Sequence, residues 1–124
     1  GTLPDSPRVH EVGFVPLARL LPEVDAIVGA GGMGTVQATL SAGLPMVLRP
    51  VMGDQPRNAQ RAADAGIGIA IDDPAEAGPA VRAVLSQPRY RAAAQDAAAA
   101  IRSMPTPDAV LGDLLVRTSL SAQK

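Results

Sequence analysis

The stretch DAIVGAGGMGTVQATLSAG, residues 25–43, constrains the fold of this chain more than any other. Its first residues, Asp25 to Val28, form a short apolar segment that predicts a buried strand of a parallel sheet. Four glycines follow between positions 29 and 34, and the residues from Thr35 to Ala42 have a helical pattern that Gly43 ends. A strand, a glycine-rich turn and a helix in this order are typical of α/β domains.

The glycine loop can also bring bare backbone N–H groups close to an anion. The N–H groups at the start of a helix have no partner inside the helix, and the helix dipole makes that end positive. A phosphate or diphosphate is therefore the natural ligand of such a loop. The alternative is that the glycines only make a tight turn, because the pattern by itself is a weak signal.

The rest of the chain continues the alternation of strands and helices. The other expected strands are Val9–Val15, Pro45–Leu48 and Ile67–Ile71. The other expected helices are 17–21, 57–65 (ended by Gly66), 74–85, 90–103 and 106–117. This alternation predicts an α/β fold, a Rossmann-like parallel sheet with helices packed on it.

We expect the domain to cover residues 9–118, between a loose segment at 1–8 and a frayed tail at 119–124. Ligands of parallel α/β sheets bind at the carboxyl ends of the strands. The loop at Pro16, the glycine loop and the loop at Asp54-Gln55 are all expected at that edge. The sequence therefore predicts that these three loops lie together at the carboxyl edge of the sheet.

Composition excludes several other classes of function. The net charge is −1 and the chain contains no cysteine and one histidine, His10, so disulfides, a thiol nucleophile and a histidine-cluster metal site are excluded. No Lys/Arg run suggests a nucleic-acid partner. No apolar run approaches the roughly 18 residues of a membrane span. We expect a cytoplasmic protein without a metal or cofactor.

The glycines fit a second pattern, because GAGGMG matches the dinucleotide fingerprint G-x-G-x-x-G. That interpretation needs an acidic residue at the tip of the next strand, about 20 residues on. The next expected strand ends in Arg49, and Asp54 lies in a loop beyond it. If this alternative holds, Arg49 favours NADP over NAD.

Four segments in order carry a resemblance to a known family. They are FVPL, then DAIVGAGGMGTVQATLSAGLPMVLRP, then GDQPRNA, then AGIGIAI, and the likeness covers residues 9–103. This order resembles the C-terminal, nucleotide-sugar half of two-domain bacterial antibiotic and macrolide glycosyltransferases of the UDP-glucosyltransferase superfamily. The resemblance implies half of a GT-B fold, a UDP- or dTDP-sugar as donor, and transfer of a hexose to a small-molecule acceptor.

The resemblance also implies a role for each motif. Phe14 and Val15 would flank the base of the nucleotide. Gly31, Gly32, Gly34 and Thr35 would hold the diphosphate. Asp54 and Gln55 would hold sugar hydroxyls, since a carboxylate accepts from two hydroxyls and an amide both donates and accepts. Asn58 would serve the phosphate. For each of these, a purely structural role is the alternative: a core position for Phe14, a surface loop for Asp54-Gln55, and a helix start for Asn58.

Two positions depart from the family pattern. Ala30 stands where the family usually has a histidine that donates to a phosphate, and Ala38 stands where a polar residue often holds the ribose. These departures leave open a degenerate domain that keeps the fold and has lost the donor.

No residue is expected to catalyse transfer, because no Ser/His/Asp set is present and the family's acceptor site and base lie in an N-terminal domain. We also expect the first strand and helix of this half to be missing from the sequence. We therefore expect an incomplete enzyme, inactive alone, that docks a missing domain or a partner subunit, or forms a homodimer, through an exposed sheet edge.

Overall fold

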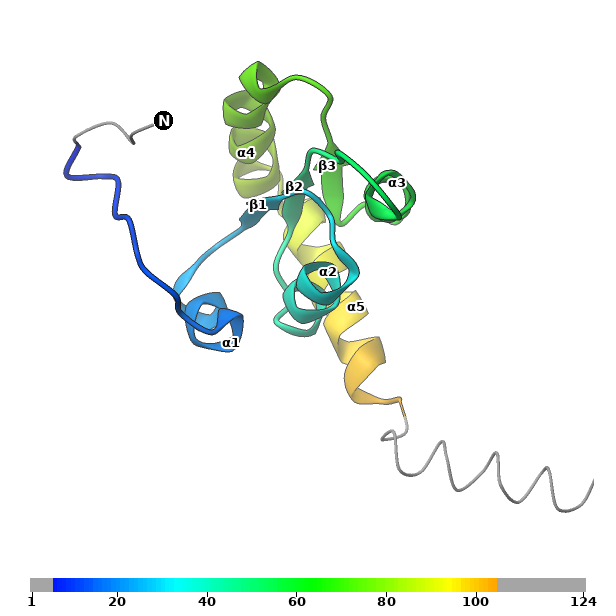
Figure 1. Ribbon diagram of the computed structural model, residues 1–124. Coiled ribbons are helices and arrows are strands. Elements are labelled where there is room, and N and C mark those ends of the chain that lie inside the picture. The colour runs from blue at the N-terminus through cyan, green and yellow to red at the C-terminus, as the bar shows by residue number, and fades with distance from the viewer. Residues whose placement is uncertain (1–5, 105–124) are drawn as a thin grey trace, which may run out of the picture.

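The computed structural model describes residues 6–104, and its centre is a parallel sheet of three strands in the order β1-β2-β3 (Figure 1). The strands are β1 (Ile27–Gly29), β2 (Met46–Leu48) and β3 (Gly68–Ala70). Val28 pairs with Val47, which pairs with Ile69. All three side chains of β2 are buried, as expected for a central strand with helices on both faces.

Helices connect and cover these strands. They are α1 (Leu17–Leu20), the 3-10 turn η1 (Leu21–Glu23), α2 (Met33–Ser41), α3 (Gln55–Asp64), the 3-10 turn η2 (Pro74–Glu76), α4 (Ala77–Ser86) and α5 (Pro88–Arg102). The fold class is therefore the predicted one, an α/β fold with a parallel sheet and helices packed on it.

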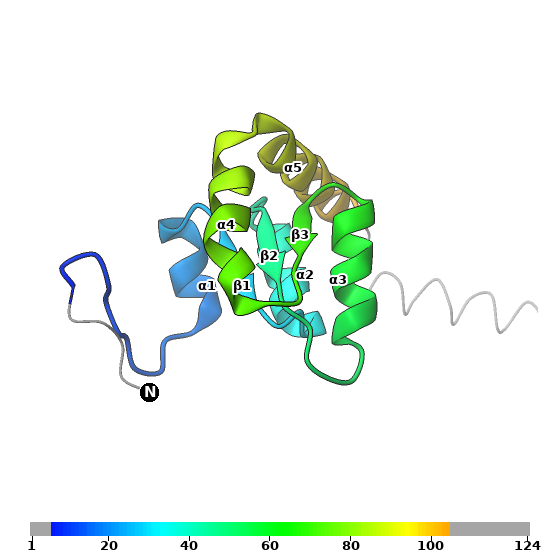
Figure 2. The same ribbon diagram turned by 90° about the horizontal axis from the view of Figure 1, so that it is seen from above.

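The alternation of side chains along β2 divides the core into two clusters. Met46 and Leu48 pack with residues of α2, α3 and α5, whereas Val47 faces the other cluster, which α4 completes. Helix α5 contributes to both clusters, with Ala94 in the first and Tyr90 in the second. Figure 2 shows α4 on one side of the strands and α2 and α3 on the other. Small side chains in the helices let them approach the sheet closely.

The ends of the helices follow the signals in the sequence. Gly43 and Gly66, which were predicted to end two helices, have φ of 71° and 73°, a left-handed conformation in which glycine has no steric cost. Helix α2 begins at Met33, slightly earlier than the sequence predicted, and its N-cap is Gly32. The expected helix at 106–117 and the expected tail at 119–124 lie outside the described residues.

The expected strand at Val9–Val15 is wrong. None of its residues is in a strand, and Val9, Val12 and Phe14 are exposed. A strand needs a neighbour to accept its backbone hydrogen bonds and an apolar surface to cover its side chains. Within residues 6–104 this segment has neither, and Figure 1 shows it running away from the sheet. The loop at Pro16 therefore does not follow a strand, unlike the other two predicted loops.

Residues 6–104 lack two features. No helix there has the length and hydrophobicity to cross a bilayer. No group of three or more His, Cys, Asp or Glu side chains in that part of the chain is arranged to hold a metal ion.

Candidate functional site

The start of α2 presents free backbone N–H groups at the carboxyl edge of the sheet. The first hydrogen bond inside the helix runs from Val36 N to Gly32 O at 3.0 Å, and no side chain caps the helix. The amides of residues 32–35 therefore have no acceptor within α2. Gly34 is exposed, and Gly32 and Thr35 are half-buried, so an anion can reach this end of the helix.

Gly31 fixes the path of the loop into α2. Its φ is 96°, and a side chain added there would lie 3.4 Å from the backbone oxygen of Gln55 and 3.6 Å from Leu48 Cδ1. A residue with a Cβ is strained in this conformation. The same contacts show that the glycine loop lies against the loop that carries Asp54 and Gln55, so two motifs about 20 residues apart in sequence meet, as predicted.

Asn58 links these two loops directly. Its side-chain amide donates from Nδ2 to the carbonyl oxygen of Gly31 at 2.8 Å, and the residue is 3% exposed. Its backbone N–H donates to Asp54 O at 3.0 Å, which holds it in the first turn of α3. The structure therefore places Asn58 beside the glycine loop, with one amide hydrogen engaged by the protein.

Gln55 organises the loop that precedes α3. Its Oε1 accepts hydrogen bonds from the backbone N–H groups of Val51, at 2.9 Å, and Met52, at 3.0 Å. Its Nε2 can still donate to a ligand. Asp54 is the N-cap residue of α3, is exposed, and forms no side-chain capping bond. Of the predicted pair, Asp54 therefore has the freer side chain for hydroxyl groups.

The two predicted base-binding residues precede α1, in the segment that forms no strand. Phe14 is 100% exposed, and Val15 is half-buried just before α1. The core position that was the alternative for Phe14 is therefore wrong within the described part of the chain. The structure does not bring Phe14 into contact with the glycine loop.

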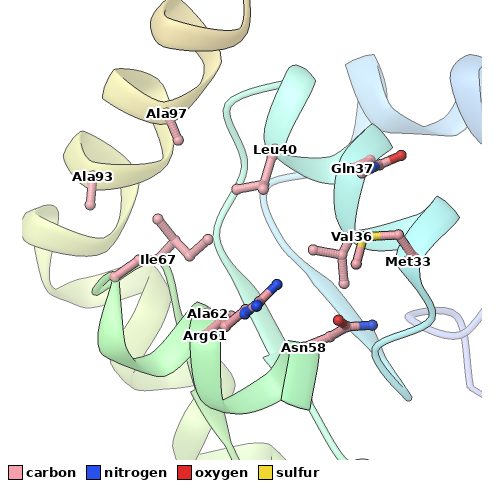
Figure 3. Close-up of a pocket in the computed structure, with 11 residues that line it drawn as sticks. Met33, Val36, Gln37, Leu40, Asn58, Arg61, Ala62, Ile67, Ala93 and Ala97 are labelled. Carbon is pink, nitrogen blue, oxygen red and sulfur yellow. The ribbon is translucent and has the colours of Figure 1, made fainter. Parts of the chain in front are cut away.

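One groove of the described chain lies between α2, α3 and α5. It encloses about 430 Å³, and most of its lining is apolar, including Met33, Val36, Leu40 and Ile67 (Figure 3). Asn58 is its only lining residue among the predicted site residues. The groove has few polar groups to hold a diphosphate, whereas the loop edge has several amides, so the loop edge is the better candidate for a charged ligand.

Two sets of hydrogen bonds in the site region were not expected from the sequence. In the first, the Gln55 side chain accepts from two N–H groups of its own loop. The other joins the loops after β2 and β3, because Arg49 donates from Nε to the carbonyl oxygen of Asp72 at 3.0 Å. The spacing of Gln55 three and four residues after Met52 and Val51 was a signal for the first. Nothing in the sequence pairs Arg49 with Asp72.

The dinucleotide interpretation is not supported at the strand tip. Strand β2 ends at Leu48 and is followed by Arg49, and Asp54 lies at the start of α3 rather than at the end of a strand. No acidic side chain therefore occupies the position where this interpretation needs one.

Comparison with known proteins identifies the family. Residues 1–116 match the family described as erythromycin biosynthesis protein CIII-like, C-terminal domain. The elloramycin glycosyltransferase ElmGT of Streptomyces olivaceus is 38% identical over 109 residues, which cover 86% of this chain and 27% of that protein.

Solved structures agree with this match. The glycosyltransferase VinC in complex with DTDP has a TM-score of 0.82 at 31% identity, over 93% of this chain and 30% of VinC. The spinosyn rhamnosyltransferase SpnG complexed with thymidine diphosphate has a TM-score of 0.76 at 31% identity, over 92% of this chain and 32% of SpnG. This chain thus spans about a third or less of each of these proteins. It belongs to the family of erythromycin biosynthesis protein CIII-like C-terminal domains, which form the C-terminal half of bacterial antibiotic glycosyltransferases of the GT-B fold.

Proposed function

We propose that this chain is a donor-binding domain that holds a nucleoside-diphosphate hexose for transfer to a small-molecule acceptor. The observation that carries the proposal is the set of free amides at residues 32–35, which face the carboxyl edge of the sheet beside the Asp54 loop. The amides and the positive end of the α2 dipole would bind the diphosphate. Thymidine diphosphate is the first nucleotide to test, because VinC and SpnG hold it in the structures named above.

The sugar would lie over the loop that precedes α3. The Asp54 carboxylate can accept hydrogen bonds from two neighbouring hydroxyls, and the Gln55 Nε2 can donate a further one. Phe14 and Val15 would flank the base, as the family resemblance implies. The donor is a substrate, and we propose no resident cofactor and no catalytic residue in this chain. The acceptor site and the catalytic base would come from another domain or a partner chain.

The test is a titration of the chain with dTDP, UDP and NADP⁺, followed through the backbone amide signals of residues 32–35. We expect saturable shifts with dTDP or UDP. No shift at millimolar nucleoside diphosphate would overturn the proposal, and saturation by NADP⁺ alone would favour the dinucleotide alternative.

The sugar contact has its own test. Asp54→Asn weakens acceptance from hydroxyls but keeps the size of the side chain. We expect it to lower affinity for dTDP-glucose about tenfold, since hydrogen bonds to charged groups contribute roughly 1.5–3 kcal/mol. Affinity for dTDP without a sugar should stay the same or rise slightly, because a negative charge near the phosphates is lost. Equal loss for both ligands would contradict the placement of the sugar.

The degenerate domain is the second candidate, and Ala30 is the observation that favours it. In that case the unaltered chain binds no nucleotide, and Ala30→His restores a measurable affinity. If the unaltered chain binds already, the same substitution should tighten binding about ten- to a hundredfold through one charge-assisted hydrogen bond. Ala99→His, at an exposed position of α5, is the matched control and should change nothing.

Self-association is a further part of the proposal. Strands β1 and β3 are the edges of the described sheet, and Val28 of β1 is 54% exposed. Unpaired strand edges can pair with another chain. Light scattering should show a species larger than the monomer, and a monomer at high concentration would contradict this part.

A further inference from the structure

We propose that Asn58 is a positioning residue that orients the peptide between Gly31 and Gly32, and that it acts on the bound anion only through that peptide. The inference rests on the proposed function, because the anion is the diphosphate at the start of α2. In this inference Asn58 contacts the glycine loop and does not itself contact the phosphate.

Burial and hydrogen bonding distinguish Asn58 from the other polar residues. It and Thr39 are the buried polar residues of the described chain, at 3% and 1% exposure. Thr39 donates from Oγ1 to Thr35 O, four residues away in its own helix, at 2.7 Å. Asn58 instead donates to Gly31 O, 27 residues away, at 2.8 Å. A buried bond across this sequence distance fixes one loop relative to another helix.

The geometry of the peptide bond makes this contact directional. The described chain has no cis peptide, and in a planar trans peptide the C=O of one residue and the N–H of the next point in opposite directions. Since the Gly31 carbonyl points to Asn58, the Gly32 N–H points away from Asn58 and α3. Among residues 6–104 that N–H donates to no backbone acceptor. It is therefore free to meet an anion.

Without the hydrogen bond from Asn58, the peptide between Gly31 and Gly32 could rotate easily. Gly31 and Gly32 lack side chains, and Gly31 has a φ of 96°, which only glycine adopts readily. A rotated peptide would present the Gly31 carbonyl oxygen to the diphosphate and turn the Gly32 N–H inward, which would replace an attraction by a repulsion. Asn58 thus sets the orientation before the ligand arrives, so that binding needs no rearrangement there.

The test compares Asn58→Leu with Thr39→Val. Both replace a buried polar side chain by an apolar one of similar size, but only the first removes the bond to Gly31. We expect Asn58→Leu to weaken dTDP binding about tenfold, the value of one hydrogen bond to a charged group. The Gly32 amide signal should lose its dTDP-induced shift while those of Gly34 and Thr35 keep theirs. Thr39→Val should bind dTDP as the unaltered chain does.

Unchanged affinity and an unchanged Gly32 shift in a folded Asn58→Leu chain would overturn the inference. If that variant does not fold, hydrogen exchange in the unaltered chain without nucleotide tests whether the Asn58 hydrogen bond forms. One Nδ2 proton of Asn58 should exchange with solvent far more slowly than the side-chain amide of exposed Gln37. Equal exchange rates would overturn the inference. If the unaltered chain binds neither dTDP nor UDP but the Asn58 amide exchanges slowly, the proposed function is wrong. The hydrogen bond from Asn58 to Gly31 is then only a structural part of the fold.

Discussion

Two predicted parts of the site differ sharply in how the fold holds them. The glycine loop at 31–35 and the segment at 54–58 are joined by the Asn58 hydrogen bond and lie against each other where Gly31 meets the Gln55 backbone. The Gln55 side chain also holds its own loop, by accepting from Val51 N and Met52 N. The segment at 9–15 has Phe14 fully exposed and forms no strand. Both were predicted from short sequence motifs.

The difference teaches that a motif becomes a site only when other elements hold it. The first part lies between β1, β2 and the start of α3, which supply hydrogen bonds and packing on several sides. The second has no such neighbours among the described residues. The residues proposed for the diphosphate and the sugar are therefore held in place by the fold, whereas Phe14, proposed for the base, is not held by other elements within residues 6–104.

Substitution of one glycine in each part should give the largest contrast in stability. Gly31→Ala forces a Cβ into a positive-φ conformation beside Gln55 O, so we expect a loss of about 1–2 kcal/mol in the free energy of unfolding. Gly13→Ala is the control, because no atom lies within 4 Å of its added Cβ, and its effect should stay within about 0.5 kcal/mol. Urea denaturation measures both, and equal effects would break the comparison.

Gln55 gives a smaller effect and tests whether its amide oxygen holds the loop. Gln55→Ala leaves the N–H groups of Val51 and Met52 without this acceptor, so we expect a loss of about 1 kcal/mol and faster exchange of those two amide hydrogens. Gln55→Glu keeps an acceptor and should retain slow exchange. If the Glu variant exchanges as fast as the Ala variant, the oxygen is not what holds the loop.

Phe14 should give the smallest effect on stability and a clear effect on binding. Its side chain is fully exposed, so Phe14→Ala should change the free energy of unfolding by less than about 0.5 kcal/mol. If the base stacks on the ring, affinity for dTDP should fall about tenfold, since stacking of a base on an aromatic side chain contributes roughly 1–3 kcal/mol. Affinity for inorganic pyrophosphate should not change. Loss of stability without loss of binding would reverse the expected roles of this residue.

The sequence was informative where local chemistry sets the conformation. Gly43 and Gly66 were predicted to end helices because glycine adopts the left-handed conformation without steric cost, and both adopt it. Pro45–Leu48 was predicted as a strand, and β2 is the fully buried centre of the sheet. The strand predicted as buried was 25–28, and this burial is wrong, because β1 lies at the edge of the described sheet and Val28 is 54% exposed. The apolar segment at 9–15 has the same kind of signal and forms no strand, because pairing depends on a neighbour that the segment itself cannot specify.

The sequence by itself determined the α/β class, the order of the elements between residues 17 and 103, and the glycine loop as an anion-binding candidate, because each depends on residues close together in the chain. Only the tertiary structure decided what the polar side chains do there. Asn58 turns to Gly31 and Gln55 turns to its own loop, while Asp54 remains exposed. A hydrogen bond depends on the distance and direction between two groups, and for residues separated by a strand and a helix the packing of the sheet sets both.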